Sequence, residues 1–447
     1  MSGKMPNKVF IEEHLKHCLE NLSTKESYIP GVIVGQVIGE NYYVVHLSAI
    51  NIQNEHTNKS HALVYNCPSD LMIDSNRIFQ KSLEVVNLLP GGSHVLGLFF
   101  IVPQDLKSVQ PININFHEFN NLLVESPLCD KNKSWNYLQL NYSTVNKKSF
   151  CYTVDFNSVT TPITTTYKSI SEIFGSFDND WVTLVGKFNF DALDRFNVSG
   201  GPKALISIRQ ILLNKLESIL NGSVCTFNGN VYDENQTLKD FECNRMGDLL
   251  TNVINVEFYR KLDPGNECKK ASLKVERGKG KILMSGLCSL AVPFNRNGTI
   301  KSAIKAIHED AMRTFTIRLN MHLQLLAEEE DIEEEDDDTH IVHETPRRIL
   351  ILKTEGSRFV FSDYVFPGEA PQSSLSVAGE ILNLPEQNMK LCDELERGRH
   401  SYYETLPDMD SNLTQDTIAV TTNNHIMLYL SLMAVLIAIL GYSIVYM

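Results

Sequence analysis

Few residues of this chain have the types and spacing that catalysis requires. Ser93 and His94 could serve as a nucleophile and a general base, but adjacent residues rarely point together, and no acid nearby in the sequence would orient the histidine. His117 and Glu118 begin a zinc-protease motif, yet Asn121 stands where its second histidine is needed. The sequence contains neither a GxSxG nor a GxGxxG pattern. These observations argue against the familiar hydrolase and dinucleotide-binding sites.

Cysteines and carboxylates give equally little indication of a reactive or metal-binding centre. The nine cysteines are spread singly and form no CxxC pair, as expected for reduced, mostly buried thiols. Glu328 to Asp338 holds ten carboxylates in eleven residues but lacks the turn glycine of a calcium loop, which favours a solvated linker. We expect no cofactor and no metal. A cysteine-dependent hydrolase stays an alternative, in which Cys67 or Cys129 would be the nucleophile.

The apolar pattern around Ser93 and His94 predicts the elements that position them. Ile78 to Leu89 has the pattern of a helix that stops at Pro90-Gly91-Gly92. Val95 to Val102 is apolar at every position, as in a strand buried on both faces. Further helices are predicted at Val9–Leu22 and Gly201–Asn221, and from Ile300 to Leu326. Further strands are predicted at Val32–Ile38, Tyr42–Leu47, Trp135–Asn141, Ser149–Phe156, Trp181–Phe190, Arg347–Leu352 and Phe359–Phe366, with a late hairpin at Ala271–Val275 and Ile282–Phe294.

The last long apolar stretch predicts a membrane anchor. Ile426 to Tyr446 runs twenty-one residues without a charge, and as a helix it would be roughly 31 Å long, which matches the bilayer core. Met1 to Leu22 has scattered charges and no continuous apolar core, so it is not a signal peptide. We therefore expect a tail-anchored protein with its body in the cytosol, although charge leaves the orientation open. The transmembrane residues include Ile426, Leu430, Val435, Leu440 and Tyr446.

Composition fits a folded cytosolic body of more than one core. The chain has 447 residues, of which 43% are hydrophobic and 21% charged. Its formal net charge of -14 argues against a nucleic-acid partner, because phosphate binding needs a concentrated basic face. The predicted divisions are a first domain at 1–165, a second α/β region at 166–327 that ends in the long helix, an acidic linker at 328–345, C-terminal strands packing on the body at 346–384, a flexible tether at 385–424 and the transmembrane helix at 426–446.

Several short motifs keep a fixed order along nearly the whole chain. They are Gly35-Gln36, Leu88-Leu89-Pro90-Gly91-Gly92 with the strand after it, the helix Ser302–Leu326, Pro346-Arg347-Arg348, Gly356-Ser357 and Asp363-Tyr364. Together with the terminal anchor they resemble the odorant-response-abnormal protein 4 family. The resemblance implies a non-enzymatic accessory protein of the endoplasmic reticulum membrane. Such a protein helps a subset of G-protein-coupled receptors, odorant receptors among them, to fold and reach the cell surface or cilium. It also implies a partner, the cysteine protease that processes the ubiquitin-fold modifier and is recruited to the reticulum.

The strand after Pro90-Gly91-Gly92 is also similar to the MPN fold of the JAMM metalloproteases. Active members carry a His-x-His-Pro sequence, whereas Phe100 and Val102 stand at the two histidine positions before Pro103. Neither side chain can hold zinc. The likeness implies that residues 1–165 form an inactive MPN-like domain kept as a binding surface. The fold class is therefore α+β, with an MPN-like mixed sheet flanked by helices, a further α/β region and a C-terminal transmembrane helix.

Partner contacts are expected near Leu88–Val102 and Ile304–Leu326, although core packing explains most of these apolar residues equally well. The candidate partner-binding residues are Leu89, Gly91, Gly92, Phe99, Phe100, Phe315 and Leu319. Beside the adaptor and the hydrolase, a third possibility stays open. The chain could be a structural tether of another organelle, since mitochondrial and peroxisomal tails are also short apolar helices.

Overall fold

The computed structural model describes residues 8–22, 28–53, 60–62, 75–103, 119–121, 123, 126, 128, 136–154, 167–170, 172–175, 180–195, 202–246, 249–260, 281–329, 345–354, 359–366 and 368–396. Met1–Asp393 forms one compact unit, which is described below, and Glu394–Met447 a second. Outside the described residues lie the predicted span Ile426–Tyr446, most of the acidic run, and the predicted strand Ala271–Val275. Within the described ranges, none of the helices combines the length and the apolar character that crossing a membrane requires.

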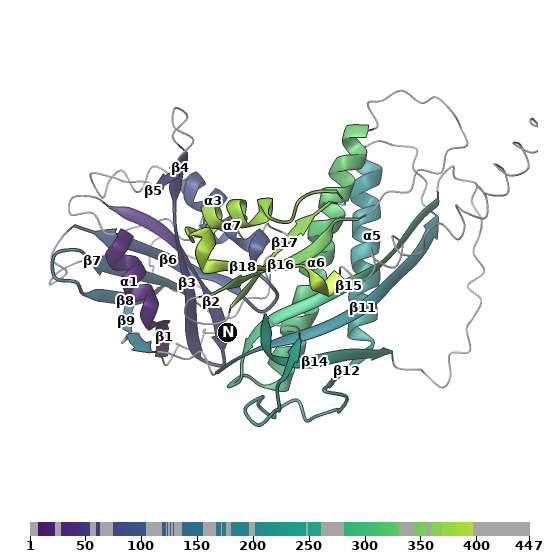
Figure 1. Cartoon of the computed structure of the whole chain (residues 1–447), viewed down its shortest axis with the longest axis horizontal. Coiled ribbons are helices and arrows are strands. Elements are labelled where there is room, and N and C mark those ends of the chain that lie inside the picture. The colour runs from purple at the N-terminus through teal and green to yellow at the C-terminus, as the bar shows by residue number, and fades with distance from the viewer. Residues whose placement is uncertain are drawn as a thin grey trace, which may run out of the picture. The chain divides into compact units, whose positions relative to one another are not determined.

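A mixed sheet of eight strands builds the first part of the unit (Figure 1). Its strands are β1 (Lys8–Glu12), β2 (Ile29–Ile38), β3 (Asn41–Ala49), β6 (His94–Val102), β7 (Tyr137–Ser143), β8 (Ser149–Val154), β9 (Tyr167–Ile170) and β10 (Glu172–Gly175). Their order is β10-β1-β3-β2-β6-β7-β8-β9. β1 runs parallel to both β3 and β10, and β6 runs parallel to β7. The sheet therefore extends to Gly175, past the predicted domain end at residue 165. A small separate pair is formed by β4 (Asn51–Gln53) and β5 (Ser60–Ala62).

Strand β6 is buried on both faces, as its unbroken apolar sequence predicts. Phe100 and Val102 contribute to the core cluster on one face, and Phe99 and Ile101 to the cluster on the other. A Cβ atom at Gly97 would collide with the backbone of Leu138 on β7. Glycine is therefore required for the close approach of these two strands.

The first element differs from the prediction. Val9–Leu22 does not form one helix, because Lys8–Glu12 is strand β1 and the helix α1 spans Glu13–Leu22. β1 pairs with β3 and β10, and the side chains of Val9 and Ile11 are buried in the core on one face of the sheet. Phe10 points to the opposite face and stacks on Tyr43 of β3. This alternation has the period of a strand, and its sheet partners override the helical spacing that continues behind it.

A second sheet contains β11 (Trp181–Arg195), β12 (Ser223–Phe227), β13 (Asn244–Met246), β14 (Leu250–Arg260) and β15 (Lys281–Asn295). Its order is β12-β14-β11-β15, with β13 on β14. The helices α5 (Pro202–Asn221) and α6 (Ile300–Glu329) pack against each other, and α6 also contacts β15 (Figure 1). The predicted strand Ile282–Phe294 lies within β15, where its partner is the antiparallel β11 along its whole length.

The third sheet is built from the C-terminal part of the unit. It has the order β17-β16-β18, with β16 at Arg347–Lys353, β17 at Val360–Val365 and β18 at Met389–Cys392. Helix α7 (Ser373–Leu382) contacts β3 and helix α3 (Ser75–Leu88). The prediction of a flexible tether from residue 385 is wrong for 386–392, because a 3₁₀ turn at Glu386–Asn388 leads into β18. Met389 and Cys392 are buried there, so two apolar side chains hold this otherwise polar segment on β16.

His46 and Ser48 on β3 bind the C-terminal end of α7. His46 Nε2 lies 2.8 Å from the carbonyl oxygen of Leu382, and Ser48 Oγ donates to the carbonyl oxygen of Ile381 at 2.6 Å. Burial lowers the pKa of His46 to about 3. The imidazole is therefore neutral at ordinary pH, and its Nε2–H donates to the otherwise unsatisfied helix end.

His46 makes the stability of the fold depend on pH. The unfolded chain gains a proton at this residue near the ordinary histidine pKa of 6.5, whereas the folded chain does so only near pH 3. A lowered folded-state pKa stabilises fully above the unfolded value, and the free energy of unfolding falls by about 1.4 kcal/mol for each pH unit below it. We expect His46→Gln, which can donate the same bond without titrating, to lower the slope of stability against pH by about this amount in urea denaturation from about pH 4 to 6. An unchanged slope in the variant would contradict the neutral buried ring.

Candidate functional site

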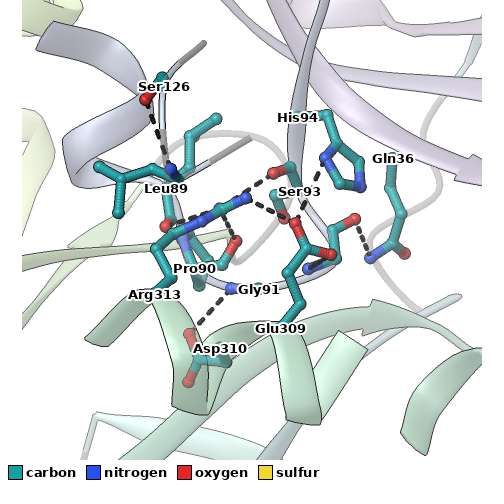
Figure 2. A network of polar contacts seen from close by, with 12 residues as sticks. Gln36, Leu89, Pro90, Gly91, Ser93, His94, Ser126, Glu309, Asp310 and Arg313 are labelled. Carbon is teal, nitrogen blue, oxygen red and sulfur yellow. Dashed lines mark hydrogen bonds and ion pairs between the residues drawn. The ribbon is translucent and has the colours of Figure 1, made fainter. Parts of the chain in front are cut away.

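The loop between α3 and β6 is bound by two acidic residues of α6 (Figure 2). The Gly91 N–H donates to Asp310 Oδ1 at 2.8 Å, and the Gly92 N–H donates to Glu309 Oε2 at 3.2 Å. Gly91 and Asp310 are 219 residues apart along the chain. The short Pro-Gly-Gly motif thus recognises a distant helix through its backbone.

Glycine is required at both positions of this loop. A Cβ atom at Gly91 would collide with the backbone of α6, at the carbonyl oxygen of Ala306 and the nitrogen of Asp310. Gly92 has a φ of +71°, a conformation that residues with a side chain rarely adopt. The loop can lie against α6 only because both residues lack side chains.

Arg313 of α6 holds the same loop from its carbonyl side. Its Nη1 donates to the carbonyl oxygens of Leu89, Pro90 and Ser93, at 2.9, 2.7 and 3.2 Å. Its Nη2 donates to Glu309 Oε1 at 2.6 Å, one helical turn away. The guanidinium therefore binds three carbonyl groups along the loop from the end of α3 to the start of β6, and it also holds Glu309 in place.

Asp310 also ties the loop to the second and third sheets. Arg348 of β16 donates through Nη1 to Asp310 Oδ2 at 2.6 Å and through Nη2 to Oδ1 at 2.9 Å. Oδ2 accepts a further bond from the Ala291 N–H of β15 at 3.2 Å. Arg348 in turn donates to the carbonyl oxygen of Ser289 and to Ser362 Oγ. Asp310 and Arg348 are each 1% exposed, so they form a buried bidentate ion pair. Their remaining donors and acceptors are bound by neighbouring groups of the protein.

Gln36 of β2 completes the arrangement. Its Nε2 donates to the carbonyl oxygens of Gly92 and Pro293, at 3.1 and 3.3 Å, and its Oε1 accepts from the Asn295 N–H at 3.0 Å. The amide thus joins the first sheet to the end of β15. We call the set Gln36, Gly91, Gly92, Glu309, Asp310, Arg313 and Arg348 the polar junction.

The polar junction places an acid beside His94 that the sequence does not reveal. His94 Nδ1 lies 3.6 Å from Glu309 Oε1. Ser93 Oγ is buried and has no hydrogen-bond partner within the described residues, so the nucleophile and base of the sequence hypothesis do not meet there. Glu309 is itself bound by Arg313 and Gly92. The two carboxylates of the junction bind main-chain N–H groups and arginine side chains of the protein itself.

Six of the seven candidate partner-binding residues are buried, and Gly92 is partly exposed. Two of them, Gly91 and Gly92, belong to the polar junction. The five others are at most 2% exposed: Leu89, Phe99, Phe100, Phe315 and Leu319. In this conformation they have no surface to offer a partner, which favours the packing role that the sequence analysis kept as the alternative.

A cysteine of β12 and a histidine of α6 lie close together. Cys225 Sγ on β12 lies 3.9 Å from His308 Nε2 on α6. Burial raises the pKa of the Cys225 thiol to about 11 and lowers the pKa of His308. Both groups are therefore neutral, unlike the thiolate of a catalytic pair. Cys67 and Cys129, the nucleophiles of the hydrolase alternative, lie outside the described residues, and across the described ranges no three His, Cys, Asp or Glu side chains could hold a metal ion.

Comparison with known proteins identifies one family over most of the chain. The family described as "Odorant response abnormal 4-like" matches residues 31–391. The "Protein odr-4 homolog" of Pongo abelii is 20% identical over 405 residues, which cover 86% of this chain and 84% of the relative. The Xenopus laevis protein of the same name is 23% identical over 404 residues, 86% of this chain and 85% of the relative. Among solved structures, the crystal structure of UfSP from C. elegans is 10% identical with a TM-score of 0.40, covering 85% of this chain and 57% of that chain.

Proposed function

The chain belongs to the Odorant response abnormal 4-like family, and from this premise we propose that it is a non-enzymatic adaptor anchored in the endoplasmic reticulum membrane. Ile426–Tyr446 forms its single membrane span, and the bulk of the chain lies in the cytosol. The adaptor assists the folding, traffic and surface or ciliary localisation of a subset of G-protein-coupled receptors, such as odorant receptors. It also recruits the ubiquitin-fold-modifier protease to the reticulum.

The observation that carries this proposal is how the polar junction uses its charges. Asp310, Glu309, Arg313 and Arg348 bind each other, main-chain groups and neighbouring side chains of the same unit. A reaction centre would keep such groups free to approach a substrate. Charges that bind groups of the same unit hold the three sheets and α6 in a fixed arrangement. A binding scaffold needs such rigidity. The apolar Phe100 and Val102 in β6 agree with this, because neither can coordinate a metal.

Receptor delivery tests the proposal. In cells that lack the protein, the full chain is expected to restore the surface level of a dependent receptor, whereas a chain ending at Asn424 is not. The reason is that the shortened chain loses the apolar segment that would place it beside newly made receptors. Surface labelling of the receptor at equal expression of both chains measures the difference. Equal rescue by both chains would contradict a role for the anchor.

A matched pair of variants separates the adaptor from the hydrolase alternative. Cys67→Ala and Cys129→Ala in the full chain remove the two thiols proposed as nucleophiles. The adaptor predicts that both variants restore receptor delivery as well as the parent chain, because no thiolate takes part. Loss of delivery in either variant, at normal expression and fold, would favour a cysteine-dependent enzyme.

A further inference from the structure

A second buried group of charges lies apart from the polar junction. Lys353 Nζ is 2.6 Å from His14 Nε2, 3.0 Å from the carbonyl oxygen of Val45 and 3.6 Å from Glu12 Oε2. His14 Nδ1 lies 3.1 Å from the same Glu12 oxygen. The side chains of Glu12 and Lys353 are each 2% exposed, while that of His14 is 22% exposed. The carboxylate, the imidazole and the ammonium group each lie close to the other two, so the three residues form a compact cluster.

The proton positions on His14 and Lys353 can be assigned from the contacts of this cluster. The Lys353 ammonium group carries only donors, so His14 Nε2 must accept its hydrogen bond. Burial, and then the charge of Lys353, lower the pKa of His14 to about 3. The neutral imidazole therefore carries its hydrogen on Nδ1, the atom that faces the Glu12 carboxylate. Lys353 and His14 are joined by a hydrogen bond, whereas Glu12 is held by the charge of Lys353 and by its proximity to His14 Nδ1.

The cluster joins β1 and α1 to β16, a strand that is far from them in the sequence. Glu12 is the last residue of β1 and His14 is in the first turn of α1. Lys353 is the last residue of β16, where it pairs with Met389, the first residue of β18. The contact between Lys353 and His14 spans 339 residues. Through Lys353, the C-terminal sheet therefore contacts the first described strand and helix of the chain.

Within the first sheet, β1 is held by its pairing with β3 and β10 and by the burial of Val9 and Ile11. It is five residues long, and both of its neighbours, β3 and β10, are parallel to it. Short parallel pairings are weaker than antiparallel ones. If Lys353 withdrew, Glu12 would be left as a buried charge without this counter-charge, which would destabilise β1 in its place.

We propose that Glu12, His14 and Lys353 form a latch that couples the docking of the C-terminal sheet to the ordering of β1 and α1. Undocking of β16 and β18 releases β1 and α1, and release of β1 loosens β18 to the same extent, because coupling between two sites is reciprocal. The partly exposed helix α1 therefore reports whether the C-terminal end of this unit is in place.

Amide hydrogen exchange of the full chain, followed by mass spectrometry, tests the latch. In Lys353→Met we expect peptides from residues 8–22 to exchange about tenfold faster, because they open without the whole unit unfolding. Arg347→Met is the matched control on the same strand. Arg347 forms a partly exposed ion pair with Asp393 at 3.6 Å, so its loss should leave residues 8–22 unchanged.

The reciprocal variant makes the test independent of how well Lys353→Met folds. Glu12→Gln keeps the shape of the side chain and removes its charge, and it should speed exchange in the peptide 389–392 as well as in 8–22. The latch is overturned if the faster exchange stays confined to the strand that carries each substitution, or if Arg347→Met gives the same pattern as Lys353→Met. A further readout is the His14 ring, whose pKa should move back toward its ordinary value in Lys353→Met.

Discussion

Replacing Arg348 by methionine is expected to lower the free energy of unfolding by about 3–5 kcal/mol, the usual cost of breaking a buried ion pair from one side. Methionine fills much of the space of the arginine stem but donates no hydrogen bond. Asp310 would keep the Gly91 and Ala291 N–H groups and lose both bonds from the guanidinium. A carboxylate that is 1% exposed cannot recover this loss from water. Urea denaturation of the full chain followed by circular dichroism measures the change.

The neighbouring arginine provides the control. Arg347→Met on the same strand removes only a partly exposed ion pair with Asp393 and should cost less than about 1 kcal/mol. A double variant, Arg348→Met with Asp310→Leu, should regain part of the loss, because an apolar pair leaves no buried charge behind. Equal destabilisation by Arg347→Met and Arg348→Met would show that the polar junction does not hold the sheets together.

Local periodicity explains which elements could be predicted from the sequence. The helices Ser75–Leu88 and Pro202–Asn221 and the doubly buried strand His94–Val102 all follow patterns that are complete within a few turns or residues. Such patterns depend on neighbours along the chain and not on distant partners. The same reasoning failed for Lys8–Glu12, whose conformation is decided by β3 and β10.

The polar junction could be predicted only in pieces. Gln36, the Pro-Gly-Gly loop and Arg348 all stand in the motifs that carry the family resemblance, but the sequence does not say that they meet. One signal was available in α6, where Asp310 lies four residues after Ala306 and three after Ile307, on the face that is buried. A charge in an apolar stripe must be paired, so Asp310 indicated a buried ion pair. The periodicity of the helix could not show which residue is its partner.

The roles of Gly91 and Gly92 illustrate the same limit. The sequence suggested that this loop contacts a partner protein, and in the structure its contact is the chain's own helix α6. A glycine pair at a helix end predicts a turn or a close backbone approach equally well, and only the fold shows which segment comes close. The burial of Phe99 and Phe100 follows from the sequence, whereas the surface that a partner would use does not.

Membrane recruitment of the modifier protease is the most direct test of the adaptor proposal. We expect the full chain, purified from detergent-solubilised membranes, to carry the protease with it. A chain ending at Asn424 should still bind the protease but leave it in the cytosolic fraction, because the segment removed is the one long enough to span a bilayer. Recovery of the protease with both chains, and its presence in the membrane fraction only with the full chain, is the predicted result. Absence of the protease from both preparations would contradict the recruitment that the proposal assigns to this protein.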